Sequence, residues 1–215
     1  MEFLFRIECD SYSLALARFD ESEEVLLDDF VAYRDRYEEE IRGYGASKRR
    51  LEYLCTRRLL KELLQQEVWV SHAEDGRPYL DGFPFQLSIS HAANYVAVML
   101  GKTLPVGVDV ELKREKLFRI QYKFLTEEES SWVDSCPDKE DRLSALLLLW
   151  CAKEAVFKRY ERPLPEFSEE IAVKPFVIGQ SEGGLSVVAD LNGGKTPISL
   201  EYKMFGDVAL VYTIS

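Results

Sequence analysis

One order of predicted elements occurs twice along this 215-residue chain, and this repetition constrains the fold more than any other feature. Each copy has a long helix with apolar residues at helical spacing, followed by two hairpins of alternating apolar and polar residues. The predicted segments are, in chain order, 47–64, 67–80 and 83–100, and then 138–160, 171–190 and 198–214. We therefore expect two similar α+β halves related by a pseudo-two-fold, residues 1–104 and 105–215. An ordinary α+β domain without duplication also fits the pattern.

Local signals predict where several elements begin and end. Two strands are expected first, at Glu2–Cys9 and Ser13–Arg18, followed by an acidic helical stretch over 21–44. The expected N-caps are Ser47, then Thr126 in a capping box with Glu129, and then Asp138 or Asp141. Turns are expected at Asp75-Gly76, near Ala92–Asn94, at Gly183-Gly184 and at Gly206-Asp207.

The composition excludes several classes of protein. A net charge of −11 argues against general nucleic-acid binding, although a local basic cluster can still hold an anionic ligand. No stretch approaches the ~20 apolar residues of a membrane span, and the first ten residues lack a signal-peptide pattern. The cysteines have no metal-ligand spacing, so we expect reduced, structural thiols in a cytoplasmic protein. They are Cys9, Cys55, Cys136 and Cys151.

The segment VGVDVEL, residues 106–112, alternates between apolar and acidic residues. In a strand its valines share one face, and Asp109 and Glu111 share the other, roughly 6–7 Å apart. One interpretation is a half-exposed strand with a charged outer face. The other is a hard-cation site, because carboxylates and few other protein ligands suit Mg²⁺. Gly107 on the carboxylate face favours close approach of a ligand or a backbone.

The helical segment WCAKEAVFK, residues 150–158, follows a run of four leucines. Glu154 and Lys158 are four residues apart and share a face, so a solvated ion pair is one interpretation. A helix packed over the strand would instead aim Glu154 at the same ion as Asp109 and Glu111. Lys158 would then lie one turn further on, where it could meet a phosphate.

Other stretches carry weaker signals. The segment ISH places Ser90 and His91 where a strand meets a turn, and a lone loop histidine is more often a surface residue. Arg77 lies in a turn that Gly76 and Pro78 alone explain. The common nucleotide-binding, hydrolase and metalloprotease motifs are absent from the sequence.

Taken together and in order, GRP, ISH, GVDVE, FLTEEE and WCAKEAVFK resemble the large, two-half type of 4′-phosphopantetheinyl transferase, as in surfactin synthetase activation. The family's W-x-x-K-E-x-x-x-K helix and G-x-D-x-E strand are both met in full. The resemblance covers about 47–158. It implies the 4′-phosphopantetheinyl transferase fold, with coenzyme A in the cleft between two α+β halves. It also implies a holo-[acyl-carrier-protein] synthase type of reaction, in which 4′-phosphopantetheine moves from coenzyme A to a carrier-protein serine and 3′,5′-ADP is released.

The same resemblance implies roles for individual residues. Asp109, Glu111 and Glu154 would ligate Mg²⁺, and Glu154 or a metal-bound water would take the serine proton. Lys158 would neutralise or protonate the departing phosphate, and His91 completes the expected catalytic set. Coenzyme A would be held by Lys48, Lys61, Arg77, Ser90, His91, Lys153 and Lys158, with Lys153 at the diphosphate.

The sequence departs from the family at a few positions. Ser88, Ala92 and Arg77 stand where Asn, Ser and Lys are frequent, and RYERPLPEF, residues 159–167, replaces a glycine-rich turn. These changes affect the adenosine end of coenzyme A and leave the metal ligands intact. The alternatives are a non-catalytic relative that binds carrier protein or coenzyme A, and a Mg²⁺-dependent hydrolase of coenzyme A or nucleotide.

The expected partner is an acyl or peptidyl carrier protein, with no nucleic acid and no membrane. Because such carriers are acidic in this family, we expect docking on a local basic patch formed by Lys113, Arg114, Lys116 and Arg119. Two complementary halves favour a monomer.

Overall fold

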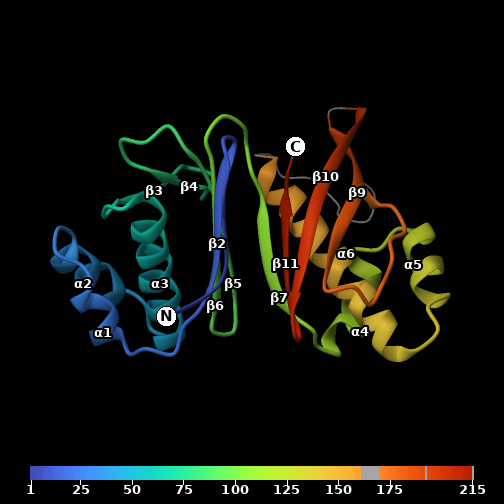
Figure 1. Cartoon of the computed structure of the whole chain (residues 1–215), viewed down its shortest axis with the longest axis horizontal. Coiled ribbons are helices and arrows are strands. Elements are labelled where there is room, and N and C mark those ends of the chain that lie inside the picture. The colour runs from blue at the N-terminus through green and yellow to red at the C-terminus, as the bar shows by residue number, and fades with distance from the viewer. Residues whose placement is uncertain (161–169, 192, 215) are drawn as a thin grey trace. The chain divides into compact units, whose positions relative to one another are not determined.

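Runs of helices and runs of antiparallel strands follow one another along the chain, which confirms the α+β prediction (Figure 1). The computed structural model describes residues 1–160, 170–191 and 193–214. Contacts divide the chain into two compact units, Met1–Pro105 and Val106–Ser215. We call them the N-terminal unit and the C-terminal unit and describe each by itself. No helix among the described residues is both long and apolar enough to cross a membrane.

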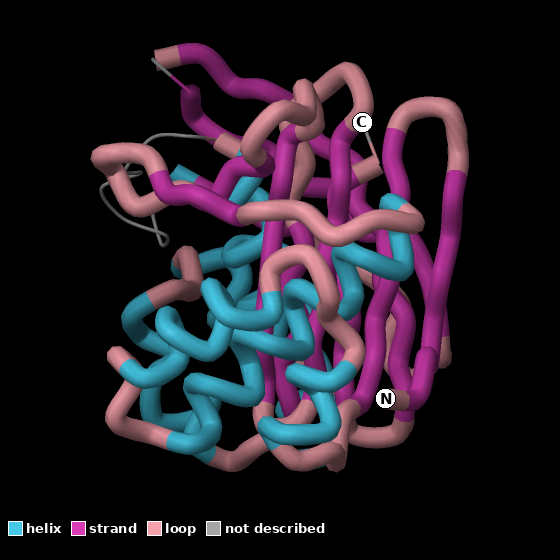
Figure 2. Tube along the Cα trace, turned by 90° about the vertical axis from the view of Figure 1, so that its left-hand side faces the viewer, coloured by secondary structure: helices cyan, strands magenta, loops and turns pink. Residues whose placement is uncertain are grey.

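In the N-terminal unit, helix α3 packs on one face of a four-stranded antiparallel sheet, and α1 and α2 pack on α3; Figure 2 shows helices gathered in front of strands. The strand order is β1-β2-β6-β5, and β3 and β4 form a separate hairpin. The apolar side of α3 packs on β2 and β6, where Leu54, Leu59, Val96 and Val98 are fully buried. The elements are β1 (Glu2–Glu8), β2 (Tyr12–Arg18), α1 (Glu23–Asp28), α2 (Arg34–Arg42), α3 (Ser47–Leu64), β3 (Val70–His72), β4 (Pro78–Leu80), β5 (Gln86–Ala92) and β6 (Tyr95–Gly101).

Two local predictions in this unit were wrong. The acidic stretch 21–44 forms two helices, because the chain between them is fixed by a distant side chain. The Glu67 carboxylate accepts hydrogen bonds from the backbone N–H groups of Val31, Ala32 and Tyr33. Ser47 lies inside α3 instead of capping it, and its hydroxyl donates to Glu23 at 2.8 Å.

In the C-terminal unit, a five-stranded antiparallel sheet with the order β7-β11-β10-β9-β8 packs against the long helix α6. Asp138 caps α6 and Thr126 and Glu129 form the predicted capping box on α5. The elements are β7 (Val108–Leu112), α4 (Lys116–Ile120), the 3₁₀ turn η1 (Gln121–Lys123), α5 (Glu127–Asp134), α6 (Lys139–Arg159), β8 (Ile171–Val173), β9 (Glu182–Leu191), β10 (Gly194–Phe205) and β11 (Val208–Thr213).

The two sheets share a strand order. In each unit the last strand, β6 or β11, lies between an early strand and the strand that precedes it, giving β2-β6-β5 and β7-β11-β10. The segments YVAVML and DVALVYTI therefore occupy equivalent places, as the sequence pattern suggests. The pseudo-two-fold itself stays a prediction.

The turn predicted at Gly183-Gly184 was also wrong, because both glycines lie inside β9. A β-carbon on Gly183 would come within 2.9 Å of the Tyr202 ring on the neighbouring strand, so this glycine makes room for an aromatic side chain. The turn at Gly206-Asp207 is confirmed between β10 and β11. Most of the segment RYERPLPEF, residues 161–167, lies outside the described residues.

Candidate active site

Strand β7 presents its carboxylates to α6. Asp109 and Glu111 alternate with Val108 and Val110, which are almost completely buried, and α6 packs on β7. The close approach predicted at Gly107 is made by the backbone of α6. A β-carbon on Gly107 would meet the Ala155 carbonyl oxygen at 1.8 Å. The carboxylate face of β7 is therefore covered by the helix and is not an outer face.

Lys158 reaches from α6 to the strand. Its ammonium donates to Asp109 Oδ1 at 2.7 Å and to the Val108 carbonyl oxygen at 3.2 Å. Asp109 is 5% exposed, and its side chain is the more buried member of the pair. Lys158 therefore forms a tertiary ion pair, which replaces the solvated pair with Glu154 that the i, i+4 spacing allows.

Glu154 lies in a field that favours its protonated form. Its pKa is raised to about 7, mainly by burial and also by the Asp109 and Glu111 charges, while the Lys158 ammonium opposes the rise. The carboxylates of β7 and α6 are thus close enough to affect one another. A carboxyl with a pKa near 7 can accept or release a proton at neutral pH, which suits general acid–base chemistry.

The donor set suits a hard divalent cation. Asp109, Glu111 and Glu154 offer only carboxylate oxygens, the ligands that Mg²⁺ prefers. Binding would also relieve the mutual repulsion that raises the pKa of Glu154. Among the described residues, no three His, Cys, Asp or Glu side chains are already gathered as a metal site. The residues therefore fit Mg²⁺ by their chemistry, and the site remains a proposal.

Lys153 lies elsewhere than predicted. It is fully buried, and its ammonium pairs with Glu129 at 2.7 Å. Burial lowers the pKa of Lys153, while the Glu129 charge raises it. This contact contradicts a position on the coenzyme A diphosphate, because the ammonium points into the interior of its own unit. Trp150, from the same motif, packs edge-on against Phe124 with ring centroids 5.2 Å apart.

In the N-terminal unit, His91 on β5 contacts α3. Its Nε2 lies 2.7 Å from Thr56 Oγ1, and that hydroxyl donates its one proton to the Glu52 carbonyl oxygen. Nε2 must therefore carry the proton of the shared hydrogen bond. Ser90 precedes His91 and is buried. This hydrogen bond fixes the orientation of the imidazole ring.

The three predicted cations of this unit have acidic neighbours. Lys48 lies 3.4 Å from Glu52, and Arg77 binds Asp75 at 2.6 Å within its turn. The ammonium of Lys61 contacts the Asp29 carbonyl oxygen and, at 3.2 Å, the Glu67 carboxylate. Lys48 and Arg77 are exposed, so their surface ion pairs contribute little and can exchange for a ligand. Lys61 is more firmly held.

Arg57 belongs to a basic cluster of the sequence, with Arg58 and Lys61, but sequence reasoning gave it no role of its own. Its side chain is buried on α3 and stacks on Tyr53, with the guanidinium carbon 3.5 Å from the ring centroid. Its Nε makes no hydrogen bond among the described residues. Burial lowers the pKa of Arg57, and the groups that oppose this are tyrosines. A buried guanidinium without a carboxylate is costly, which points to an anionic ligand.

Comparison with known proteins finds one family that resembles the C-terminal unit. Residues 105–209 match the family model of the 4′-phosphopantetheinyl transferase superfamily. This segment of the chain is similar to the 4′-phosphopantetheinyl transferase superfamily. The matched segment contains the β7 carboxylates, Glu154 and Lys158, so the similarity to the superfamily and the ion-pair geometry fall on the same residues.

Two curated relatives show the same similarity. A protein of Haemophilus influenzae, named as a candidate 4′-phosphopantetheinyl transferase, is 32% identical over 120 residues. That alignment covers 51% of this chain and 49% of the relative. The 4′-phosphopantetheinyl transferase gsp of Aneurinibacillus migulanus is 32% identical over 85 residues, which cover 40% of this chain and 35% of the relative. The chain thus spans about half the length of the first relative and about a third of the second.

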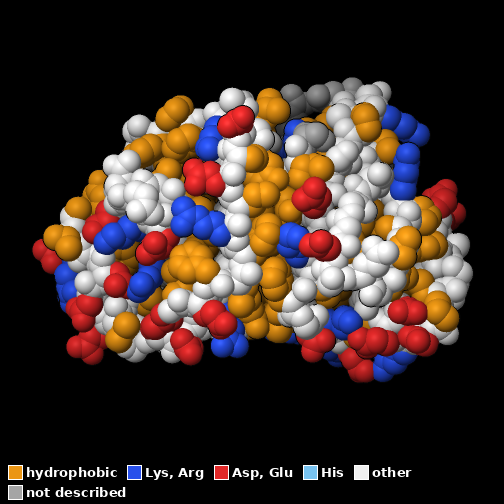
Figure 3. All heavy atoms as spheres, viewed as in Figure 1, with side chains coloured by type: hydrophobic (Ala, Val, Ile, Leu, Met, Phe, Trp, Pro, Cys, Tyr) orange, Lys and Arg blue, Asp and Glu red, His pale blue; other side chains and the backbone are white. Residues whose placement is uncertain are grey.

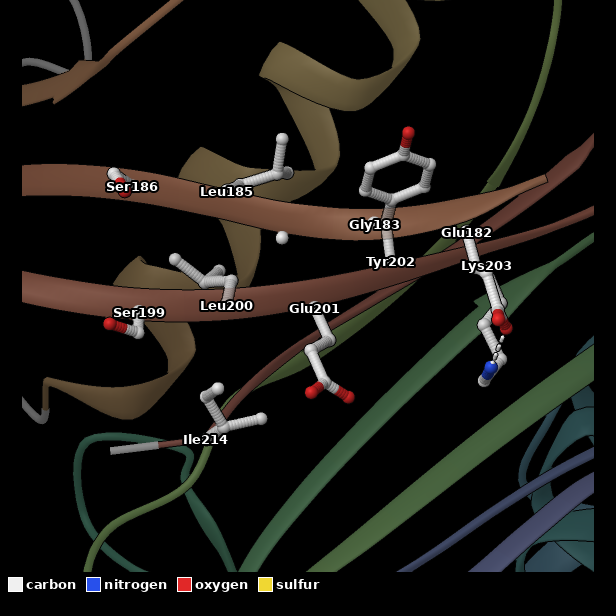
Figure 4. A pocket seen from close by; sticks show the side chains of 11 residues that line it. Glu182, Gly183, Leu185, Ser186, Ser199, Leu200, Glu201, Tyr202, Lys203 and Ile214 are labelled. Atoms are coloured by element: carbon white, nitrogen blue, oxygen red, sulfur yellow. Dashed lines mark hydrogen bonds and ion pairs between the residues drawn. The ribbon is translucent and has the colours of Figure 1, made fainter. Parts of the chain in front are cut away.

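A groove on the C-terminal unit lies apart from the predicted residues. It has a volume of about 590 Å³ and runs along β9 and β10 (Figure 4). Its lining includes Glu201, Lys203 and Ile214 and none of the residues that the superfamily motifs contain. We assign it no part in the site.

Proposed function

We propose that the chain is a phosphopantetheinyl transferase of the large, two-half type. It moves 4′-phosphopantetheine from coenzyme A to a serine of an acyl or peptidyl carrier protein and releases 3′,5′-ADP. One observation supports this most strongly: Lys158 lies 2.7 Å from Asp109, beside Glu154, whose pKa is raised to about 7 by burial and by the charges of Asp109 and Glu111. These residues fall within the matched segment 105–209.

In the proposed reaction, the serine oxygen bonds to the phosphorus that bears pantetheine, and the bond from that phosphorus to the bridging oxygen breaks. Glu154, or a water beside it, accepts the serine proton. Lys158 supplies positive charge for the phosphate of the departing 3′,5′-ADP. Asp109, Glu111 and Glu154 would hold Mg²⁺, which when bound neutralises charge on the phosphate oxygens.

The adenosine end of coenzyme A is proposed to bind cations of the N-terminal unit. Lys48, Arg77 and His91, with Ser90, remain candidates, and Lys61 is a weaker one because of its contact with Glu67. We add Arg57, since the 3′-phosphate would provide the negative charge that its buried guanidinium requires. The cleft between the halves, a monomeric state and a cytoplasmic location stay predictions.

Carrier docking is proposed on α4 and the residues before it. The basic patch is less basic than the sequence suggests, because Lys113 donates to Glu140 at 2.6 Å. Arg114, Lys116 and Arg119 are exposed, as is Tyr122, at 73%. Over the face seen in Figure 3, basic side chains are interspersed with acidic ones. Charge reversal at Arg114 and Arg119 should raise the KM for the carrier and leave the KM for coenzyme A unchanged.

The test is mass spectrometry of an apo carrier protein incubated with the chain, coenzyme A and Mg²⁺. A gain of roughly 340 Da on the carrier is expected, the mass of one phosphopantetheine group. Glu154→Gln should abolish the gain, and Glu182→Gln, in an exposed ion pair with Lys203, should not. Coenzyme A binding without any gain on several carriers would indicate the non-catalytic alternative. Release of free phosphopantetheine without a carrier would indicate the hydrolase.

A further inference from the structure

The carboxylate of Glu129 joins three separate parts of the C-terminal unit. Its Oε2 accepts from Thr126 N at 2.8 Å and lies 2.7 Å from Lys153 Nζ, and its Oε1 accepts from Val173 N at 2.7 Å. One side chain of α5 thereby contacts the cap of its own helix, α6 and β8. The side chains of Glu129 and Lys153 are 3% and 0% exposed.

Stability alone does not account for this buried pair. Taking two charges out of water is costly, and apolar residues of similar volume often replace such pairs without loss of stability. Hydrogen bonds to charged groups differ from apolar contacts in being directional. The contacts of Glu129 therefore define where α6 lies relative to α5 and β8 more sharply than apolar packing does.

The pair is next to the candidate base in the sequence. Lys153, Glu154 and Ala155 are consecutive residues of α6, so their side chains point in directions about 100° apart. Lys153 contacts α5, and the carbonyl oxygen of Ala155 lies against Gly107 beside β7. Glu154 lies between these two contacts. The helix is thus held on both sides of the residue that faces the β7 carboxylates.

We infer that Lys153 and Glu129 act as a positioning pair, which fixes α6 so that Glu154 faces Asp109 and Glu111. The inference rests on the proposed transferase function for its kinetic consequence. It assigns Lys153 a role through Glu129 and not through contact with coenzyme A.

The experiment compares Lys153→Met, Glu129→Gln and the double variant with the wild type. Lys153→Arg tests rescue by a conservative change, and Lys203→Met removes an exposed ion pair of the same unit as a matched control. Circular dichroism and thermal unfolding establish which variants are folded at the assay temperature. The double variant removes both charges together, so it remains informative where a single variant fails to fold.

If the pair positions Glu154, each single variant should lower kcat roughly 10- to 100-fold, since a displacement of about 1 Å in an active site has effects of that size. The KM for coenzyme A should stay within about twofold, and the double variant should be no worse than either single variant. A raised KM for coenzyme A in Lys153→Met but not in Glu129→Gln would mean that Lys153 binds substrate directly. An unchanged kcat in folded variants would also overturn the inference.

A second readout does not depend on activity. In two-dimensional NMR spectra, the backbone amide signals of Gly107 and Ala155 report on the contact between α6 and β7. They should shift in Lys153→Met and Glu129→Gln and stay in place in Lys203→Met. If the wild type transfers nothing, the proposed function fails, and the NMR comparison alone decides the inference. Unshifted signals in all variants would refute it.

Discussion

Gly107 and Ala155 are in such close contact that a β-carbon on Gly107 would lie 1.8 Å from the Ala155 carbonyl oxygen. The neighbouring group is helix backbone, which cannot rotate away as a side chain can. The contact therefore sets the distance between β7 and α6, and with it the distance from Lys158 to Asp109.

Gly107→Ala should accordingly destabilise the chain and reduce its activity. We expect the free energy of unfolding to fall by about 1–3 kcal/mol, the usual cost of overpacking, or by more if α6 is displaced. Urea unfolding measures this. Gly184→Ala is a matched control in β9, because its β-carbon would meet Leu200 O only at 3.9 Å. Equal effects of the two substitutions would refute the close-contact argument.

The stability of the metal-free chain should depend on pH through Glu154. The folded state raises the pKa of this group to about 7, so between pH 4.5 and 7 the folded chain holds a proton that the unfolded chain has lost. Stability from this group must then fall as pH rises, by roughly 2–3 kcal/mol over that range.

Urea unfolding at several pH values, with a chelator present, tests this dependence. The free energy of unfolding of the wild type, relative to that of Glu154→Gln, should fall as pH increases. A difference that is constant between pH 4.5 and 7 would mean that Glu154 titrates normally in the folded chain.

Arg57→Met should separate stability from ligand binding. The substitution removes a buried charge and keeps a long apolar stem over Tyr53, so the free energy of unfolding should change by no more than about 1 kcal/mol. The affinity for coenzyme A should nevertheless fall at least tenfold. Calorimetric titration with coenzyme A and with its 3′-dephospho form tests the assignment, because the variant should bind both equally. A strong preference for coenzyme A retained in Arg57→Met would exclude contact with the 3′-phosphate.

The four cysteines should differ sharply in reactivity. Burial raises the pKa of Cys55 to about 12 and that of Cys151 well above its usual value, and it also raises the pKa of Cys136. Cys9 is partly exposed, and although burial raises its pKa, hydrogen bonds with Ser11 and Tyr12 outweigh that effect and leave the pKa lowered. All four are free thiols, as predicted. Iodoacetamide at neutral pH should therefore modify Cys9 first, and peptide mapping that finds Cys55 or Cys151 alkylated in the folded chain would contradict the burial described above.

The local part of the candidate site could be predicted from the sequence. Alternation in β7 and the four-residue spacing on α6 are periodic signals, and they placed Asp109, Glu111, Glu154 and Lys158 on facing surfaces. The capping box of Thr126 and Glu129 was visible for the same reason. What was missed depends on contacts between distant segments.

Lys153 shows why a charge pattern alone misleads. Next to Glu154 it has the appearance of a ligand-binding cation, and only the packing of α5 on α6 reveals Glu129 as its partner. Arg57 is the opposite case, a candidate ligand-binding cation that the sequence does not distinguish. Among the basic residues of α3 it differs only in being buried, and burial is a property of the fold. Gly183 and Gly184 were predicted to form a turn, because glycine is frequent in turns. Glycine also occurs in strands where a neighbouring group comes close, and the ring of Tyr202 shows that this second reason applies to Gly183.

The strand order of the C-terminal unit has a consequence for biosynthesis. Among the described strands of this unit, β11 is made last, yet it lies between β7 and β10, and Asp109 pairs with Val211 across the sheet. A growing chain would therefore expose Asp109 and Glu111 while nearly the whole unit is still being synthesised. Only when β11 has left the ribosome can β7 join its sheet. A stop codon a few residues before Val208 would remove the strand that joins β7 to β10 and leave every proposed metal ligand present in a chain unable to hold them together.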